Sequence, residues 1–280
     1  MLPQNNVKPF SILLAIHEQA DSIGPFIHAL SLASIMKGEL EIIDVRRDCH
    51  HGDLGVRRTF EQWRMLPAGS NRSDVGKMGI NVKKILKKGH SEKAIGKRLE
   101  RRNHDLLVIG TDTRSGFSGL FGQYVAEHLA QSYRQTTLYV PGKTRPFVDS
   151  LSGKIGLKKI LIPITEHPCA EPAIKLTKNI LHSSSLHSAE VTGFHVGESF
   201  PVLSSLVLEN LIWNEVLFVP KGDKLVDTII KKAHEQNPDL IVMTTNGRDT
   251  FTQKIMGSIT EHVLRETPCP VLAVAVDSPL

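Results

Sequence analysis

Short apolar runs alternate with amphipathic stretches along the whole chain. In the second half, the apolar runs are flanked by polar residues, which is typical of strands buried on both faces, and the stretches between them repeat apolar residues at helical spacing. The predicted strands are 159–164, 190–196, 215–219, 240–244 and 271–276. The predicted helices are 172–181, 225–234 and 258–266. Strands separated by helices indicate a parallel sheet with right-handed crossovers.

The first half shows the same alternation with one interruption. Its predicted strands are 11–16, 39–45, 106–109 and 137–140. The region 46–80 is long and irregular in pattern, and no element is predicted in it. Residues 141–154 are rich in Pro, Gly, Ser and charge, which predicts a linker between the halves.

The two halves also repeat each other in sequence. Asp105-Leu106-Leu107-Val108 recurs as Asp239-Leu240-Ile241-Val242, 134 positions later. The same offset pairs further identical residues: Arg114 with Arg248, Glu127 with Glu261, His128 with His262, and Leu138 and Val140 with Leu272 and Val274. Near the start of each half, residues 12–13 match residues 160–161 at a larger offset, so the first half carries about 14 extra residues. A repeat of this length indicates a duplicated domain, and we predict domains at 1–146 and 154–280.

Composition narrows the class of protein. The chain has 280 residues, of which 40% are hydrophobic and 22% charged, the profile of an ordinary globular protein. It has no apolar run long enough for a transmembrane helix and no pattern of a secretory signal. Three cysteines, odd in number and widely spread, make no disulfide framework. We therefore expect a cytoplasmic protein without a membrane partner.

The net charge of +5 arises from the first half, where basic residues are in excess. We expect these side chains on solvated helix faces: Lys83, Lys84, Lys87, Lys88, Lys97, Arg98, Arg101 and Arg102. Aromatic residues make up 5% of the chain and do not interleave with the basic ones, so a base-stacking surface is not indicated. Nucleic acid is therefore not predicted as a partner.

The segment after the strand 240–244 carries the strongest chemical signal. It reads Thr244-Thr245-Asn246-Gly247-Arg248, then eight residues, then Gly257-Ser258-Ile259-Thr260-Glu261. Ser258 and Glu261 have the spacing of a capping box that opens a helix, and Gly257 lets the backbone approach a ligand. Ligands bind beyond the carboxyl ends of strands in such sheets. Free N–H groups at a helix N-terminus, with a hydroxyl beside them, suit a phosphate.

This pattern resembles the universal stress protein family, whose hallmark is G-x-x-G, nine residues, then G-S/T. Three of the four positions match, and the stretches 159–163, 239–243 and 268–272 are similar to the family as well. The resemblance covers both halves. It implies two tandem Rossmann-like domains of the adenine nucleotide α-hydrolase-like type, each with a five-stranded, mostly parallel sheet flanked by helices. It also implies two sandwiches that associate about a pseudo-two-fold axis through their last strands, with a homodimer as a further option.

The resemblance further implies an adenine nucleotide in the second domain: ATP, or AMP or ADP, with Mg²⁺ as a companion of the nucleotide. The implied phosphate contacts are Thr244, Gly247, Arg248, Gly257, Ser258, Ile259 and Thr260. Pro163, Ile164 and Thr165 would border the adenosine, with Val196 against the base. Two residues depart from the family pattern, since Thr244 replaces a glycine and Thr165 replaces an aspartate.

The first half departs further from the phosphate motif. Gly110 is kept, but Thr113, Gln123 and Tyr124 stand where the family has the second glycine and the G-S pair. Large side chains there would fill the space that phosphates need, so we expect no nucleotide in the first half.

Other candidate residues have simpler interpretations. Adjacent residues rarely supply several ligands to one metal ion, so Cys49-His50-His51 is interpreted as part of a loop. His128 and His262 are expected on helix surfaces, and Cys269 is expected to be packed rather than reactive.

No catalytic residue is predicted, because no Ser-His-Asp order, paired carboxylates or H-E-x-x-H motif is present. Three function classes stay open: a nucleotide-binding stress-response module, a ligand-free scaffold that acts by association, and a slow ATPase or related hydrolase.

Overall fold

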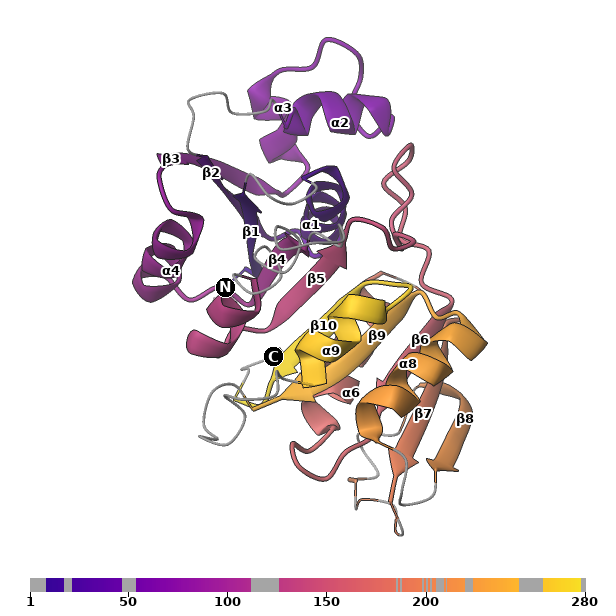
Figure 1. Cartoon of the computed structure of the whole chain (residues 1–280). Coiled ribbons are helices and arrows are strands. Elements are labelled where there is room, and N and C mark those ends of the chain that lie inside the picture. Colours follow the sequence, from indigo (N-terminus) through magenta and orange to yellow (C-terminus); the bar gives the residue numbers. More distant parts are fainter. Residues whose placement is uncertain are drawn as a thin grey trace, which may run out of the picture.

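Figure 1 shows the computed structural model of the chain, with the first half in indigo to magenta and the second in pink through orange to yellow. The structure describes residues 9–17, 22–46, 54–111, 126–184, 186, 188–197, 199, 201, 203–204, 209, 211–219, 224–246 and 259–277. Strands and helices alternate throughout this part of the chain, as the sequence predicts.

The elements of the first half are β1 (Ser11–His17), α1 (Ile23–Ile35), β2 (Glu39–Arg46), α2 (Val56–Gln62), α3 (Arg72–Lys77), β3 (Asn81–Lys88), α4 (Ser91–Arg101), β4 (Leu106–Thr111), a helix over 126–132, and β5 (Thr137–Pro141). Those of the second half are β6 (Lys159–Pro163), α6 (Glu171–Ser183), β7 (Glu190–Val196), β8 (Ile212–Val219), α8 (Leu225–Gln236), β9 (Leu240–Thr245), α9 (Ile259–Glu266) and β10 (Val271–Ala275).

One ten-stranded sheet runs through both halves, in the order β3-β2-β1-β4-β5-β10-β9-β6-β7-β8. Within each half all pairings are parallel, and the order in the first half recurs in the second. The halves join where β5 pairs with β10 in antiparallel orientation. The α/β class and the association through the last strands are thus confirmed. The expectation of two sandwiches packed against each other is wrong in one respect, because β5 and β10 pair edge to edge and join the two sheets into one.

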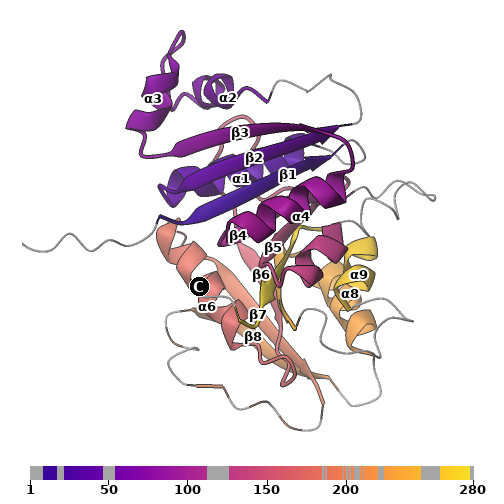
Figure 2. The same ribbon diagram turned by 90° about the vertical axis from the view of Figure 1, so that its left-hand side faces the viewer.

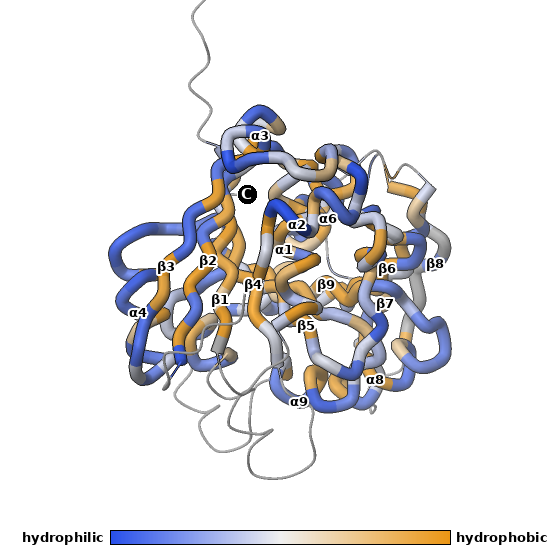
Figure 3. The backbone as a smooth tube through the Cα atoms, turned by 90° about the horizontal axis from the view of Figure 1, so that it is seen from above, coloured by the Kyte–Doolittle hydropathy of each residue, from blue (hydrophilic) through white to orange (hydrophobic). Residues whose placement is uncertain are grey.

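Helices cover both faces of this sheet (Figure 2). On one face, α1, α2 and α6 pack over an apolar cluster to which both halves contribute, for example Leu138 and Leu272. On the other face, α4, the helix 126–132, α8 and α9 pack over a second cluster, which also spans both halves. Figure 3 shows the apolar strands at the centre and hydrophilic residues along α4. The division into domains at 1–146 and 154–280 stays a proposal.

Four of the basic residues expected on a helix face lie instead on β3. This strand pairs with β2 in parallel, with Ile43 opposite Ile85, and forms an edge of the sheet. Its lysines at 83, 84, 87 and 88 are exposed. The helical expectation is wrong for them because lysine also suits an edge strand, where charge discourages pairing with another chain. Arg98 lies on α4, where it forms an ion pair with Glu41 of β2, and Arg102 follows α4 and pairs with Glu39.

The irregular region 46–80 contains two short helices that the sequence pattern does not reveal. Phe60 of α2, Trp63 just after it and Val75 of α3 are buried in the cluster under α1. Helices of seven and six residues are too short to show a clear period, and tertiary packing stabilises them.

The predicted linker is docked against the first half. The Trp63 Nε1–H donates to the Ser150 carbonyl at 3.0 Å, and the Ser31 hydroxyl donates to the Gly153 carbonyl at 2.6 Å. On either side of these contacts, the backbones of Val148 and Ile155 form an antiparallel bridge, so the segment folds back as a hairpin. It is visible in pink beside α1 in Figure 1.

The repeated aspartates have a structural role at the start of each central strand. Asp105 accepts a hydrogen bond from the Ser11 N–H at 2.7 Å, and Asp239 accepts one from the Lys159 N–H at 2.9 Å. Arg145 of the linker also contacts the Asp239 carboxylate, at 2.9 Å. The aspartate that recurs in both halves therefore fixes the first strand of each half, β1 or β6, to its neighbour, β4 or β9.

Candidate functional site

A pocket opens at the carboxyl ends of β6 and β9, where the sequence predicts the site. Its cavity measures about 80 Å³. The described residues that line it are Gln131, Pro163, Thr165, His167, Pro168, Leu225, Ile229, Met243, Thr244, Thr245, Asn246, Ile259 and Thr260. Five of these were predicted from the sequence: Pro163, Thr165, Thr244, Ile259 and Thr260. The structure thus brings together these five predicted residues, which lie up to 97 positions apart in sequence.

Two helix starts and two strand ends form this pocket. Leu225 and Ile259 are the first residues of α8 and α9, and β9 ends at Thr245. The main-chain N–H groups in the first turn of a helix have no partner within that helix, and the helix dipole is positive there. The start of α9 therefore favours an anion in this pocket.

Thr244, a residue of the pocket lining, carries a hydroxyl that no described residue satisfies. The residue is 6% exposed, and its Oγ1 is buried without a hydrogen-bond partner among the described residues. A buried hydroxyl without a partner costs about 1–3 kcal/mol. Thr244 lines the pocket, so a hydrogen bond to a ligand there would satisfy this hydroxyl.

The Thr165 hydroxyl already donates a hydrogen bond within the protein. It donates to the Pro168 carbonyl at 2.6 Å, which closes a turn at the rim of the pocket. The lone pairs of Oγ1 are still able to accept a hydrogen bond, as a ribose hydroxyl would require. A hydroxyl is a weaker acceptor than the aspartate that the family resemblance leads one to expect here.

Two other predicted residues do not line the pocket. Ile164 is buried in the cluster on the α1 and α6 face, and its N–H donates to the Phe194 carbonyl at 2.7 Å. Val196, at the end of β7, packs against the cluster on the opposite face. Gly247, Arg248, Gly257 and Ser258 lie outside the described residues.

Sequence reasoning missed several residues of the lining. Met243, Thr245 and Asn246 could have been found, because they flank Thr244 at the strand end. Leu225 and Ile229 lie on a predicted helix, but only the packing of α8 beside β9 brings them to the pocket. Gln131 carried no signal, because it comes from the first half.

The remaining candidates are structural in the described part of the chain. His128 lies 2.6 Å from the Glu92 carboxylate. Burial raises the pKa of the Cys269 thiol to about 12, and the residue is fully buried, so the packed interpretation fits. Among the described residues, no three His, Cys, Asp or Glu side chains gather as metal ligands. Cys49-His50-His51, Thr113, Gln123 and Tyr124 lie outside the described residues.

None of the described helices is both long enough and apolar enough to cross a lipid bilayer.

A family model described as "Universal stress protein family" matches residues 208–275. A putative universal stress protein of Staphylococcus aureus is 43% identical over 47 residues, which is 17% of this chain and 28% of that protein. The chain thus spans little more than a quarter of the length of the curated relatives that it matches.

Solved structures extend the likeness in fold to nearly the whole chain. A universal stress protein from Archaeoglobus fulgidus superposes with a TM-score of 0.59 at 18% identity, over 96% of this chain and 98% of that one. A putative universal stress protein from Pseudomonas aeruginosa gives a TM-score of 0.61 at 14% identity, over 95% and 93%. The sequence match thus relates residues 208–275 to the universal stress protein family, and the solved structures show that nearly the whole chain has a UspA-like fold.

Proposed function

We propose that the second half binds an adenine nucleotide, ATP or its AMP and ADP forms, in the pocket at the ends of β6 and β9. The observation that carries this proposal is Thr244, a residue of the pocket lining whose buried hydroxyl has no hydrogen-bond partner among the described residues. A phosphate oxygen would accept a hydrogen bond from this hydroxyl and would also lie near the main-chain N–H groups in the first turn of α9.

The rest of the lining suits the other parts of the ligand. Pro163, Leu225 and Ile229 supply apolar surface against which a flat base can pack. Thr165 is able to accept a hydrogen bond from the ribose. Gly247, Arg248, Gly257 and Ser258 complete the phosphate contacts in this proposal. Mg²⁺ would be held mainly by the phosphates, because the described lining contains no carboxylate.

We propose a binding module rather than an enzyme. Among the described lining residues, His167 is the one titratable side chain, and it is exposed. Positioning and charge stabilisation dominate phosphoryl transfer, and the described lining offers neither a fixed cation nor a carboxylate base. At most, a weak hydrolysis of ATP is expected.

Two measurements test this function. Mass spectrometry of the purified, denatured protein should detect co-purifying adenine nucleotide. Calorimetric titration with ATP should show binding that is abolished in the double variant Gly257→Gln with Ser258→Tyr, which copies Gln123 and Tyr124 of the first half. A folded wild type that binds neither ATP nor AMP would refute the proposal and would favour a ligand-free scaffold. A double variant that binds like the wild type would place the phosphates elsewhere.

A further inference from the structure

Gln131 belongs to the first half, yet it lines the pocket of the second. It lies on the helix 126–132, which packs on the same face of the sheet as α9. Among the described lining residues it is the one contributed by the first half. It also lines a smaller hollow between the halves, whose wall shares Thr245 and Thr260 with the nucleotide pocket. Gln131 therefore lies on the α9 side of the pocket, beside the proposed phosphate position.

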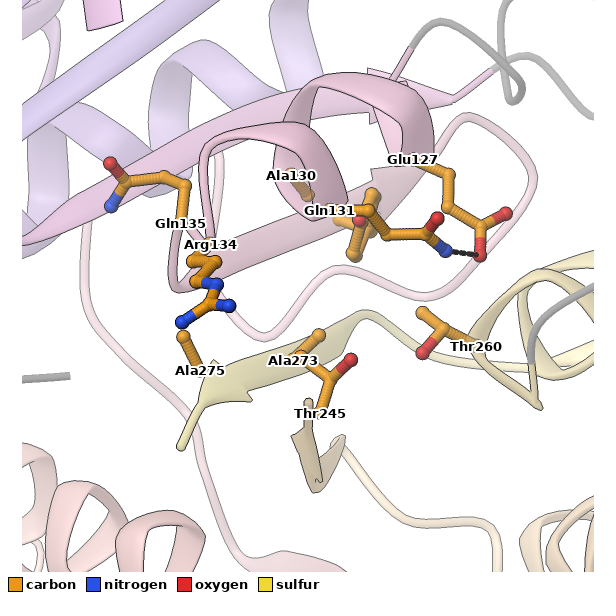
Figure 4. Close-up of a pocket in the computed structure, with 10 residues that line it drawn as sticks. Glu127, Ala130, Gln131, Arg134, Gln135, Thr245, Thr260, Ala273 and Ala275 are labelled. Carbon is orange, nitrogen blue, oxygen red and sulfur yellow. Dashed lines mark hydrogen bonds between the residues drawn. The ribbon is translucent and has the colours of Figure 1, made fainter. Parts of the chain in front are cut away.

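The Gln131 side chain is held by a defined contact. Its Nε2–H donates to the Glu127 carboxyl at 2.6 Å, one helical turn earlier (Figure 4). A primary amide has two N–H donors, and this contact uses one of them. The second N–H is thus able to donate to a ligand without loss of the contact with Glu127.

Glu127 in turn joins the first half to the start of α9. Its carboxyl accepts a hydrogen bond from the main-chain N–H of Glu261, the third residue of α9. Glu127 is buried, and Figure 4 shows Thr260 across the hollow from the Glu127–Gln131 pair. The helix start that would bind phosphate is therefore contacted from the other half of the molecule.

The repeat provides an internal comparison. The offset of 134 pairs Gln131 with Arg265 and Glu127 with Glu261, and Arg265 forms an ion pair with Glu261 one turn earlier in α9. Both halves thus keep the glutamate, and its partner one turn later is Gln131 in the first half and Arg265 in the second. Arg265 is exposed and is not among the residues that line the nucleotide pocket.

We propose that Gln131 is a ligand contact that the first half supplies to the site in the second half. Its free amide N–H donates to a phosphate oxygen of the nucleotide, and Glu127 is a positioning residue that holds the amide in place. This inference rests on the proposed nucleotide function. It gives the first half, whose own phosphate motif is degenerate, a part in the site of its neighbour.

Calorimetric titration of the full chain tests the proposal with ATP and adenosine as the two probes. Gln131→Leu should weaken ATP binding by about three- to tenfold, the range of one hydrogen bond, and leave adenosine binding unchanged. Gln131→Glu keeps the size but adds charge against the phosphates, so it should weaken ATP binding further. Arg265→Leu, the matched change in the repeat, should affect neither ligand. Thermal unfolding checks that the variants are folded.

Each outcome decides the question. Unchanged ATP affinity in folded Gln131→Leu, beside a binding wild type, overturns the inference alone. An equal loss for ATP and adenosine, or an equal loss in Arg265→Leu, also overturns it, because a general effect on the fold would then explain the result. A folded wild type that binds neither ligand refutes the nucleotide function and this inference together.

Discussion

Leu138 lies directly opposite Leu272 across the junction of β5 and β10, and the two leucines are each other's counterparts in the repeat. On either side, Thr137 faces Ala273 and Tyr139 faces Val271. This register is symmetric under the offset of 134 residues, so a pseudo-two-fold axis passes between the two leucines. The chain therefore builds within itself the kind of isologous contact that two copies of one domain would make.

The Thr244 hydroxyl should have opposite effects on stability and on binding. Thr244→Val removes a buried hydroxyl that has no partner in the described part of the chain, so the free energy of unfolding without ligand should rise by about 1–3 kcal/mol. Nucleotide affinity should fall by about tenfold, because the protein no longer donates this hydrogen bond to the ligand. Denaturant titration and calorimetry measure the two effects.

Thr111→Val is the matched control for that experiment, because the Thr111 Oγ1 at the end of β4 is also buried without a partner among the described residues. It should stabilise the protein without changing nucleotide affinity. A stabilised Thr244→Val variant with wild-type affinity would show that this hydroxyl does not contact the ligand.

Thr165→Asp should strengthen nucleotide binding by roughly tenfold, because a carboxylate accepts a ribose hydrogen bond more strongly than a hydroxyl does. It should also lower the free energy of unfolding by about 1 kcal/mol, since aspartate cannot donate to the Pro168 carbonyl. Calorimetry with ATP and urea denaturation measure both. Thr165→Val loses the same contact without gaining a charge, so it should weaken both properties. Weaker ATP binding in Thr165→Asp would argue against a ribose at this position.

Glu127 should make the protein less stable at high pH. Burial raises the pKa of its carboxyl from 4.5 to about 8, and the Glu261 charge adds to this shift. The folded state therefore holds a proton that the unfolded state has released, and stability falls as pH rises from about 4.5 to 8. Below this window both states are protonated and the loss disappears.

Glu127→Gln should remove that pH dependence. Its stability relative to the wild type should increase with pH by at most about 1.4 kcal/mol per unit and level off above pH 8. Urea denaturation between pH 4 and 9 measures this difference. Glu266→Gln, an exposed change on α9, serves as the control and should run parallel to the wild type. A parallel profile for Glu127→Gln would contradict the burial of a protonated carboxyl.

Protonation of His28 in acid should weaken the contact between α1 and the docked linker. The His28 Nδ1–H donates to the Gly24 carbonyl at 2.7 Å, and its Nε2 accepts from the Phe147 N–H at 3.3 Å, so both ring nitrogens are used in the neutral form. Burial lowers the pKa of this imidazole to about 4. The unfolded chain therefore binds a proton first, and stability is lost as pH falls from about 6.5 to 4.

His28→Phe keeps an aromatic ring but cannot titrate. It should be less stable than the wild type at pH 7, because two hydrogen bonds are lost, and its stability should fall less between pH 6.5 and 4. Hydrogen exchange at Phe147, compared at pH 7 and pH 5, reports on the contact directly. An identical acid slope in the two proteins would mean that protonation of His28 does not oppose folding.

Gly153→Ala should release the linker hairpin from α2. Gly153 has φ near 69°, and a Cβ there would lie 2.3 Å from the Trp63 ring. Gly69→Ala is the matched control, since Gly69 has φ near 76° but open space around it. The control should cost about 1–2 kcal/mol from the backbone alone, and Gly153→Ala a further 1–3 kcal/mol from overpacking. Equal costs by denaturant titration would show that the Trp63 contact is not tight.

The sequence by itself determined the class of fold, the duplication and the neighbourhood of the site. Buried parallel strands such as 240–244 read as continuous apolar runs, and the segment after such a strand lies at the ligand-binding edge of the sheet. That reasoning led to Thr244, Ile259 and Thr260, and the family resemblance added Pro163 and Thr165; all five line one pocket.

The tertiary structure decided what local pattern cannot encode. The strand β3 was hidden because its lysines suit an edge as well as a helix, and α2 was hidden because a helix of seven residues depends on the packing of Phe60 and Trp63 for its stability. Gln131 reaches the pocket only because β5 pairs with β10 and so places the helix 126–132 beside α9. Contacts between distant segments depend on how the sheet edges pair; no spacing along the chain specifies that pairing, which was expected only from the family resemblance.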